Sequence, residues 1–315
     1  MDSAAIARAR QLQSVAACAL LVLWPGFLIV LPAAWQYHWL LGLGLAIFPG
    51  VFLATWIADL THECWHDYLP GLPNPLFFRL LSWLLAYDPQ AFAIAHGYHH
   101  SKLHTYEDVE FYPLGEIRHP LKRRAYLLLE YTFGVVFTFG LLMHVVRTHP
   151  TYRPRYQRWL RWLSVLVAVL IYGGCGTAAF LLFRVPVPTI LLAYVVALVL
   201  GTAVTHHDQL IQHHGIIAEG SWNVRNRLSR NLRWPGAANK VFHFFAHGDT
   251  REHVLHHTLV KEYSRPVPGA FPMPEDATYI SIGEYIRLLW RHWKEPIPPV
   301  TAAKQAAGSE EARGV

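Results

Sequence analysis

Two long apolar stretches dominate the pattern of hydrophobic and polar positions along the chain. No Asp, Glu, Lys or Arg lies between Arg10 and Asp59, and only Arg184 lies between Trp162 and His207. One spanning helix needs about 20 apolar residues, so each stretch is long enough for two helices joined by a short turn. We therefore expect two transmembrane hairpins, with spans near residues 14–35, 39–59, 160–183 and 188–207.

Two further apolar segments, about 76–95 and about 125–146, are predicted to lie at the membrane surface. The first carries Arg79 and Asp88, and basic residues flank the second on both sides. Basic loops stay on the cytoplasmic side of a membrane, so both ends of the second segment are expected there, as an interfacial or re-entrant helix. This topology places both termini in the cytoplasm and leaves Arg184 as the only basic residue outside.

The composition excludes several classes of protein. Hydrophobic residues make up 53% and charged residues 15%, against roughly 25% charged in soluble domains, which argues against a secreted or cytosolic globular protein, a disordered chain and a coiled coil. Three cysteines are too few for a disulfide scaffold or a cysteine-built zinc site. The pI near 9.2 follows from basic membrane flanks, so no nucleic-acid partner is expected. We expect one membrane domain over residues 1–299, beginning with a permanent helix rather than a signal peptide, and a disordered tail over 300–315.

The 20 histidines fall mostly in groups just beyond the predicted spans. The groups are HECWH from His62, HGYHH from His96, HVLHH from His253, and the pairs at 206–207 and 213–214. Neutral imidazole is the commonest metal ligand. Residues i and i+4 share a helix face, so the two histidines of HECWH can reach one metal. In HxxHH the i and i+3 residues also share a face, while the adjacent histidine points about 100° away, so one triplet can serve two metals. Eight nitrogens, and a ninth from His213, suit two ions.

Other interpretations remain for individual histidines. Isolated ones are expected to be structural, namely His38, His119, His144, His149 and His292. Orienting or structural roles are expected for His104, His206, His207, His214, His243 and His247. HECWH also matches the HExxH helix of zinc proteases, in which Glu is the general base, but that site leaves the other groups unexplained.

The grouped histidines resemble those of the membrane fatty acid desaturase superfamily, non-haem di-iron enzymes with three histidine boxes. HECWH resembles box one, HGYHH box two and HVLHH box three. HHSKLHTYEDVEFYP after box two, and NKVFH with Asp249-Thr250 before box three, resemble the Δ12-type acyl desaturases. The lead-in from His243 to His253 is longer than in the plant-like pattern, and Gln212–Gly215 is also similar to an E-H-Y-G segment of alkane hydroxylases.

The resemblance implies an all-α membrane fold with a cytoplasmic, histidine-rich cap. It implies two iron ions (Fe²⁺) as cofactors and O₂ as co-substrate. The implied iron ligands are His62, His66, His96, His99, His100, His213, His253, His256 and His257. Neighbouring residues would orient the ring N–H groups of these ligands, and the candidates are Glu63, Asp67, His104, Asp108, Asp208, His214, Asp249 and Glu252.

The leading expectation for the reaction is the introduction of a double bond into a fatty acyl chain. A hydroxylase or ketolase acting on an alkyl, sterol-like or carotenoid substrate would use the same centre, and an intramembrane zinc protease or a metal transporter is the remote alternative. Electrons are expected from a separate ferredoxin, cytochrome b5-like protein or rubredoxin with its reductase. Basic residues between 147 and 161, or between 225 and 233, could dock an acidic donor or contact lipid headgroups. The expected location is an inner membrane or the endoplasmic reticulum, depending on the source.

Overall fold

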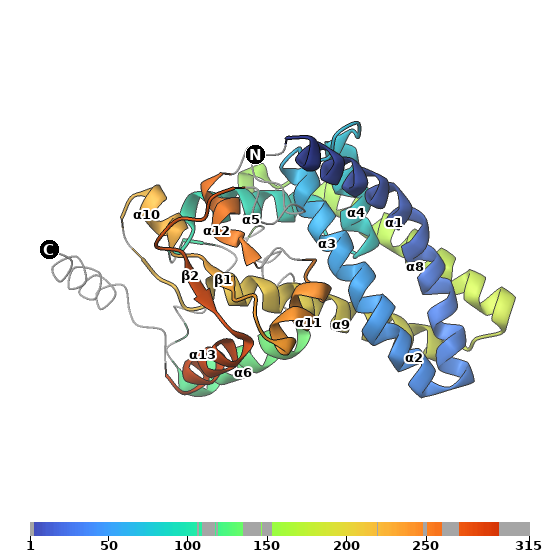
Figure 1. The fold of residues 1–315 in the computed structure, drawn as a ribbon. Helices are drawn as coiled ribbons and strands as arrows, with labels where there is room; N and C mark the ends of the chain where they lie inside the picture. The colour runs from blue at the N-terminus through green and yellow to red at the C-terminus, as the bar shows by residue number, and fades with distance from the viewer. Residues whose placement is uncertain are drawn as a thin grey trace, which may run out of the picture.

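The computed structural model describes residues 3–105, 107–108, 117, 119–134, 146, 153–218, 220–247, 251–259 and 271–295. Four helices in this part of the chain are long and apolar enough to cross a membrane, and they pair as two hairpins (Figure 1). This confirms the predicted all-α membrane fold. The first hairpin consists of α1 (Ser3–Tyr37), α2 (Trp39–Leu45), the π-helical turn η1 (Ala46–Gly50) and α3 (Val51–Trp65), and the second of α8 (Arg158–Phe183) and α9 (Val187–His213).

The second span is one continuous helical segment from Trp39 to Trp65 with a π-helical turn near its middle. Pro49 lies in this turn and has no N–H to donate, so a regular α-helical hydrogen bond cannot form there. The tight turn before the span is held by His38, whose Nδ1 accepts a hydrogen bond from the N–H of Leu40 at 3.2 Å. These local features let α1 and α3 run antiparallel with almost no connecting loop.

Two helices extend further than the hydropathy pattern predicted. Helix α1 begins at Ser3 rather than near residue 14, and α9 continues to His213 rather than ending near 207. Hydropathy reports only the lipid-facing part of a helix, whereas the backbone hydrogen bonds continue past the last apolar turn. The extension of α9 matters for function because it carries His213 out of the apolar region.

Small residues bring the two hairpins into close contact. A Cβ at Gly201 of α9 would lie 2.4 Å from the Cβ of Ala54 in α3, so only glycine allows this approach. Leu20 and Trp24 of α1 and Ile57 of α3 are fully buried in the core beside this contact. The packing places the end of α3 near the end of α9.

The remaining described elements form a cap on one end of the hairpins (Figure 1). We call these elements the cap: α4 (Asn74–Leu84), α5 (Pro89–Lys102), α6 (Pro120–Phe133), the 3₁₀ turn η2 (Arg153–Arg155), α10 (Trp222–Arg227), β1 (Arg230–Leu232), α11 (Ala237–Phe245), α12 (His253–Thr258), β2 (Thr278–Ile280) and α13 (Ile282–Lys294). The two short strands pair in parallel, with Arg230 opposite Thr278. Strand β1 follows α9 and α10 in the chain, and β2 directly precedes α13. The pairing therefore holds the region after α10 against the start of α13.

The apolar segment 76–95 is divided between two helices, α4 and α5. Helix α4 ends at Leu84, and Asp88 starts α5 by accepting hydrogen bonds from the N–H groups of Gln90 and Ala91 at 3.0 and 3.2 Å. An Asp N-cap followed by Pro89 at the first helical position favours the start of a new helix. The helical structure is therefore interrupted before Asp88, although the segment is apolar. Of the segment 125–146, α6 ends at Phe133, and the residues after Gly134 lie outside the described residues except Val146. The predicted tail, 300–315, also lies outside them, and the single domain over 1–299 stays a prediction.

Candidate metal centre

Four helices of the fold bring nine histidines to one place in the cap. His62 and His66 lie at the C-terminal end of α3, and His213 is the last residue of α9. Helix α5 carries HGYHH and α12 carries HVLHH. The three motifs and His213 therefore come from four separate helices, which the fold brings together.

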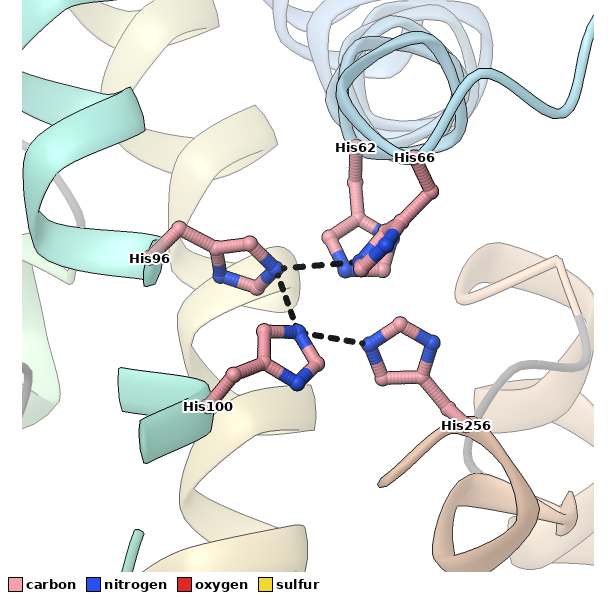
Figure 2. Close-up of side chains that lie close together, drawn as sticks. All are labelled: His62, His66, His96, His100 and His256. Carbon is pink, nitrogen blue, oxygen red and sulfur yellow. Dashed lines mark hydrogen bonds between the residues drawn. The ribbon is translucent and has the colours of Figure 1, made fainter. Parts of the chain in front are cut away.

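Five of the nine imidazoles form one group, which we call cluster 1: His62, His66, His96, His100 and His256. One ring nitrogen of each lies within 4.8 Å of the others. Figure 2 shows the rings turned toward a common centre, with Nε2 of His96 3.4 Å from Nε2 of His66 and 3.0 Å from Nε2 of His100. Nε2 of His256 lies 3.2 Å from Nε2 of His100.

The other four form cluster 2: His99, His213, His253 and His257. Nitrogens of His99, His213 and His257 lie within 4.8 Å of one another. Nε2 of His253 lies 2.9 Å from Nε2 of both His213 and His257. The two clusters are adjacent, since the rings of His100 and His257 are 5.0 Å apart.

The donor atoms fit metal ions at both positions. With metal–nitrogen distances of about 2.0–2.1 Å, two ligands at a right angle are about 3.0 Å apart and two tetrahedral ligands about 3.4 Å apart. The Nε2 separations of 2.9–3.4 Å match this spacing. Burial lowers the pKa of His100 to about 2 and holds the pKa values of His256 and His257 well below the usual range, so these rings are neutral and can donate a lone pair.

Each HxxHH triplet contributes to both clusters, but the division differs from the one that spacing suggested. His96 and His100, at i and i+4, belong to cluster 1, and His99 belongs to cluster 2. In box three, His253 and His257 belong to cluster 2 and His256 to cluster 1. Residues four apart differ by about 40° around a helix and residues three apart by about 60°, so the outer pair of each triplet aligns better than the first two.

The residues beside the ligands fix the orientation of two rings in cluster 2. Nδ1 of His99 lies 2.9 Å from Oδ2 of the buried Asp108, which accepts a hydrogen bond from the ring N–H. His104 lies behind His213, with its Nδ1 2.8 Å from the carbonyl oxygen of Arg225 and its Nε2 3.2 Å from Nδ1 of His213. Because the carbonyl only accepts, Nδ1 of His104 must donate. Burial lowers the pKa of His104 to about 3, so its Nε2 carries no proton and accepts from Nδ1 of His213. The lone pair of His213 Nε2 then faces cluster 2.

The remaining candidates have varied surroundings. Glu63, Asp208 and Glu252 are buried on or beside the helices that carry the clusters, whereas Asp67 is exposed at positive φ in the turn after α3. Asp249 lies outside the described residues. Nε2 of His214 faces the hydroxyl of Tyr131 at 3.0 Å, and its ring packs on His292. An orienting role for these residues stays a prediction.

Other histidines make structural contacts. Nε2 of His206 lies 3.4 Å from a carboxylate oxygen of Glu130 in α6, and Nε2 of His207 donates to the carbonyl of Tyr131 at 3.0 Å. His247 lies 3.1 Å from the carbonyl oxygen of Phe52 in α3. Trp65 lies inside HECWH and its ring contacts cluster 1, a contact that the spacing of the histidines does not predict.

The comparisons with known proteins give one match. The family model described as fatty acid desaturase matches residues 37–261, a range that contains all nine clustered histidines. No curated protein and no solved structure matches the chain.

Proposed function

Because the chain belongs to the fatty acid desaturase family, we propose that it is a membrane-bound di-iron oxidoreductase that uses O₂ to introduce a double bond into a fatty acyl chain. Family membership makes it a lipid-modifying oxidoreductase. The observation that supports the finer proposal is the division of nine imidazoles into two adjacent clusters of five and four. Nine nitrogen ligands are too many for one metal ion. They suit two ions, each of which keeps a coordination position for oxygen.

In this proposal, cluster 1 and cluster 2 each hold one iron ion. Bound iron would supply the activation of O₂ that removal of hydrogen from an unactivated methylene group requires. The chain itself provides neutral nitrogen ligands, fixes ring orientation through Asp108 and His104, and limits access of water, since His256 and His257 are fully buried. The overall reaction takes one –CH₂–CH₂– unit, O₂, two electrons and two protons to –CH=CH– and two water molecules.

The reaction is tested by lipid profiling of an expressing host. We expect acyl chains lighter by two hydrogen atoms than those of a host that carries the empty vector, and no such product with His99→Ala or His256→Ala. A product heavier by one oxygen atom would instead identify the hydroxylase that the sequence also allows. Metal analysis of the purified protein should give two iron ions per chain, and one zinc ion would contradict the proposal in favour of a protease.

We also propose that the cap and both termini face the cytoplasm. Two observations support this topology. The residues on the cap side are rich in Lys and Arg, and Arg184 lies in the turn between α8 and α9, at the end of the hairpin away from the cap. Single cysteines at the exposed Arg153 and Arg184 in a Cys18→Ser background test this topology. A membrane-impermeant thiol reagent applied from outside should label position 184 and not 153, and labelling of 153 would contradict the proposal.

A further inference from the structure

Trp65 packs its indole against three of the five imidazoles in cluster 1. The ring centroids of His66 and His96 lie 4.6 and 4.8 Å from that of Trp65. The His100 ring lies parallel to the indole, with 5.8 Å between centroids and 5° between planes. Trp65 is the last residue of α3 and is only half-buried, so the indole extends from the cluster toward the protein surface.

The indole also lies beside the backbone of α5 at Gly97. A Cβ on Gly97 would lie 3.7 Å from Cζ2 of Trp65, which is van der Waals contact. Gly97 also lines a surface cavity of about 520 Å³ on the outer side of α5, together with Gln90, Ala93, Ile94, Tyr98, Ser101 and Arg155. One glycine of α5 therefore lies beside Trp65 and also borders the cavity.

The rim of this cavity is positively charged. The guanidinium of Arg155 donates to the hydroxyl of Tyr98 at 2.8 Å and lies over its ring, 5.4 Å from the centroid. Arg153 and Arg158, near Arg155 in the chain, are also exposed, and no carboxylate of the described residues forms an ion pair with these three arginines. Gln90 fixes the segment to α5 through hydrogen bonds to the carbonyl of Arg155 and the N–H of Gln157, at 2.9 and 3.0 Å.

The second basic stretch, residues 225–233, has a different environment. Arg225 donates to the carbonyls of Leu103 and Ser101, and Arg230 donates to that of His214. Arg227 and Arg233 lie 3.9 and 4.0 Å from the carboxylates of Asp276 and Glu284. The cavity beside Arg227 is also lined by Glu275 and Asp276, so this surface is less suited to an acidic partner.

We propose that the cavity on the outer side of α5, with Arg155 in its lining and the exposed Arg153 and Arg158 near it in the chain, is the docking site of an acidic electron-donor protein. We propose further that Trp65 is the positioning residue that connects this site to cluster 1. The inference rests on the proposed function, because only a redox centre at cluster 1 needs electrons. The donor is oxidised by two electrons in total for each O₂ consumed, and these electrons, with two protons from solvent, complete the balance of the desaturation. The contact of an aromatic ring with three ligands shortens the gap that each electron must cross.

The docking site is tested with the iron-loaded full chain in discs of zwitterionic phosphatidylcholine. Reduced acidic [2Fe–2S] ferredoxin is the probe, and its oxidation is followed by stopped-flow absorbance over a range of salt concentrations. Because electrostatic steering raises association rates by about 10–10³-fold, Arg153→Glu with Arg155→Glu should slow the bimolecular step about 10–100-fold at low salt, and less at high salt. The control is Arg227→Glu, which reverses one arginine charge on the other surface and should leave the rate unchanged.

Trp65 is tested at saturating ferredoxin, where docking no longer limits the rate. Trp65→Leu should lose most of the ferredoxin-driven reduction, Trp65→Phe should recover part of it, and both should keep their iron. After reduction by dithionite, a small reagent that needs no docking site, both variants should form product in a single turnover as the unsubstituted protein does. If Trp65→Leu loses iron, Trp65→Phe, which keeps an aromatic ring beside cluster 1, provides the second variant and should still slow ferredoxin-driven reduction alone.

Several outcomes would overturn the inference. Equal slowing by Arg227→Glu, an unchanged rate in the double arginine variant, or no oxidation of ferredoxin by the unsubstituted protein would exclude this docking site. A defect of the arginine variant only in discs of anionic lipid would assign the arginines to lipid headgroups instead. Failure of the dithionite-reduced, unsubstituted protein to form product would contradict the proposed function, whereas ferredoxin oxidation would still report on the docking site.

Discussion

His99 and Asp108 form a buried imidazole–carboxylate pair, with 2.9 Å between Nδ1 and Oδ2. A carboxylate that accepts a hydrogen bond from the N–H of one ring nitrogen keeps the other nitrogen unprotonated and increases its basicity. In cluster 2 this interaction turns Nε2 of His99 toward the other nitrogens. Asp108 thus acts on the candidate metal centre without belonging to it.

The first prediction follows from this pair. Asp108→Ala should weaken binding of the iron ion in cluster 2 about 10–100-fold, the range measured when such a partner of a metal ligand is removed. Iron content after dialysis against a graded series of chelator concentrations measures the effect. The control is Glu107→Ala, because Glu107 is the exposed neighbour and pairs with Lys102 at the surface. Equal iron retention in the two variants would mean that the pair has no influence on the metal.

The sequence predicts the spans and the identity of the clustered histidines because both follow from local patterns. An apolar stretch without charges specifies a spanning helix, and three motifs of closely spaced histidines specify a centre. The distribution of the ligands could not be obtained this way. It depends on which side of α5 faces α3 and which faces α9, and such a rotation is decided by packing between distant segments. The pairing of His104 with His213, 109 residues apart, has the same origin.

The second prediction separates His213 from His104. His213→Ala should lose iron and nearly all activity, because Nε2 of His213 belongs to cluster 2. His104→Ala should retain iron, because His104 contacts only the outer nitrogen of His213 and a water molecule can replace it as acceptor. Metal analysis and product formation are measured on both purified variants. Equal iron loss would show that the ligand set is drawn wrongly.

The third prediction concerns the independence of the two clusters. His66→Ala should selectively weaken iron in cluster 1 and His253→Ala should selectively weaken iron in cluster 2, while both variants remain inserted in the membrane because the spans are unchanged. Each should keep about one ion and lose activity, since both ions are needed. Metal analysis with Mössbauer spectroscopy would distinguish the remaining sites. The same residual spectrum in both variants would contradict the division into two clusters.

The last prediction concerns Gly215, which follows His214 and has a φ of +72°. A Cβ there would lie 1.8 Å from Cε1 of His292 in α13, so an added methyl group meets both backbone strain and a side-chain clash. Backbone strain of this kind costs on the order of 1–3 kcal/mol, and the clash adds to it. Gly215→Ala should therefore lower the free energy of unfolding by at least about 1–3 kcal/mol and weaken iron in cluster 2, because the turn holds the end of α9 at His213.

A second substitution separates the two causes. His292→Ala in the Gly215→Ala background removes the clash but leaves the strained φ, so it should restore part of the lost stability. Gly174→Ala in α8 is the matched control, since no atom lies within 4 Å of its added Cβ and helix propensity favours alanine. Unfolding by denaturant in detergent, together with iron content, measures all three variants. Stability of Gly215→Ala equal to that of the unsubstituted protein would mean that the turn after α9 is not fixed by α13.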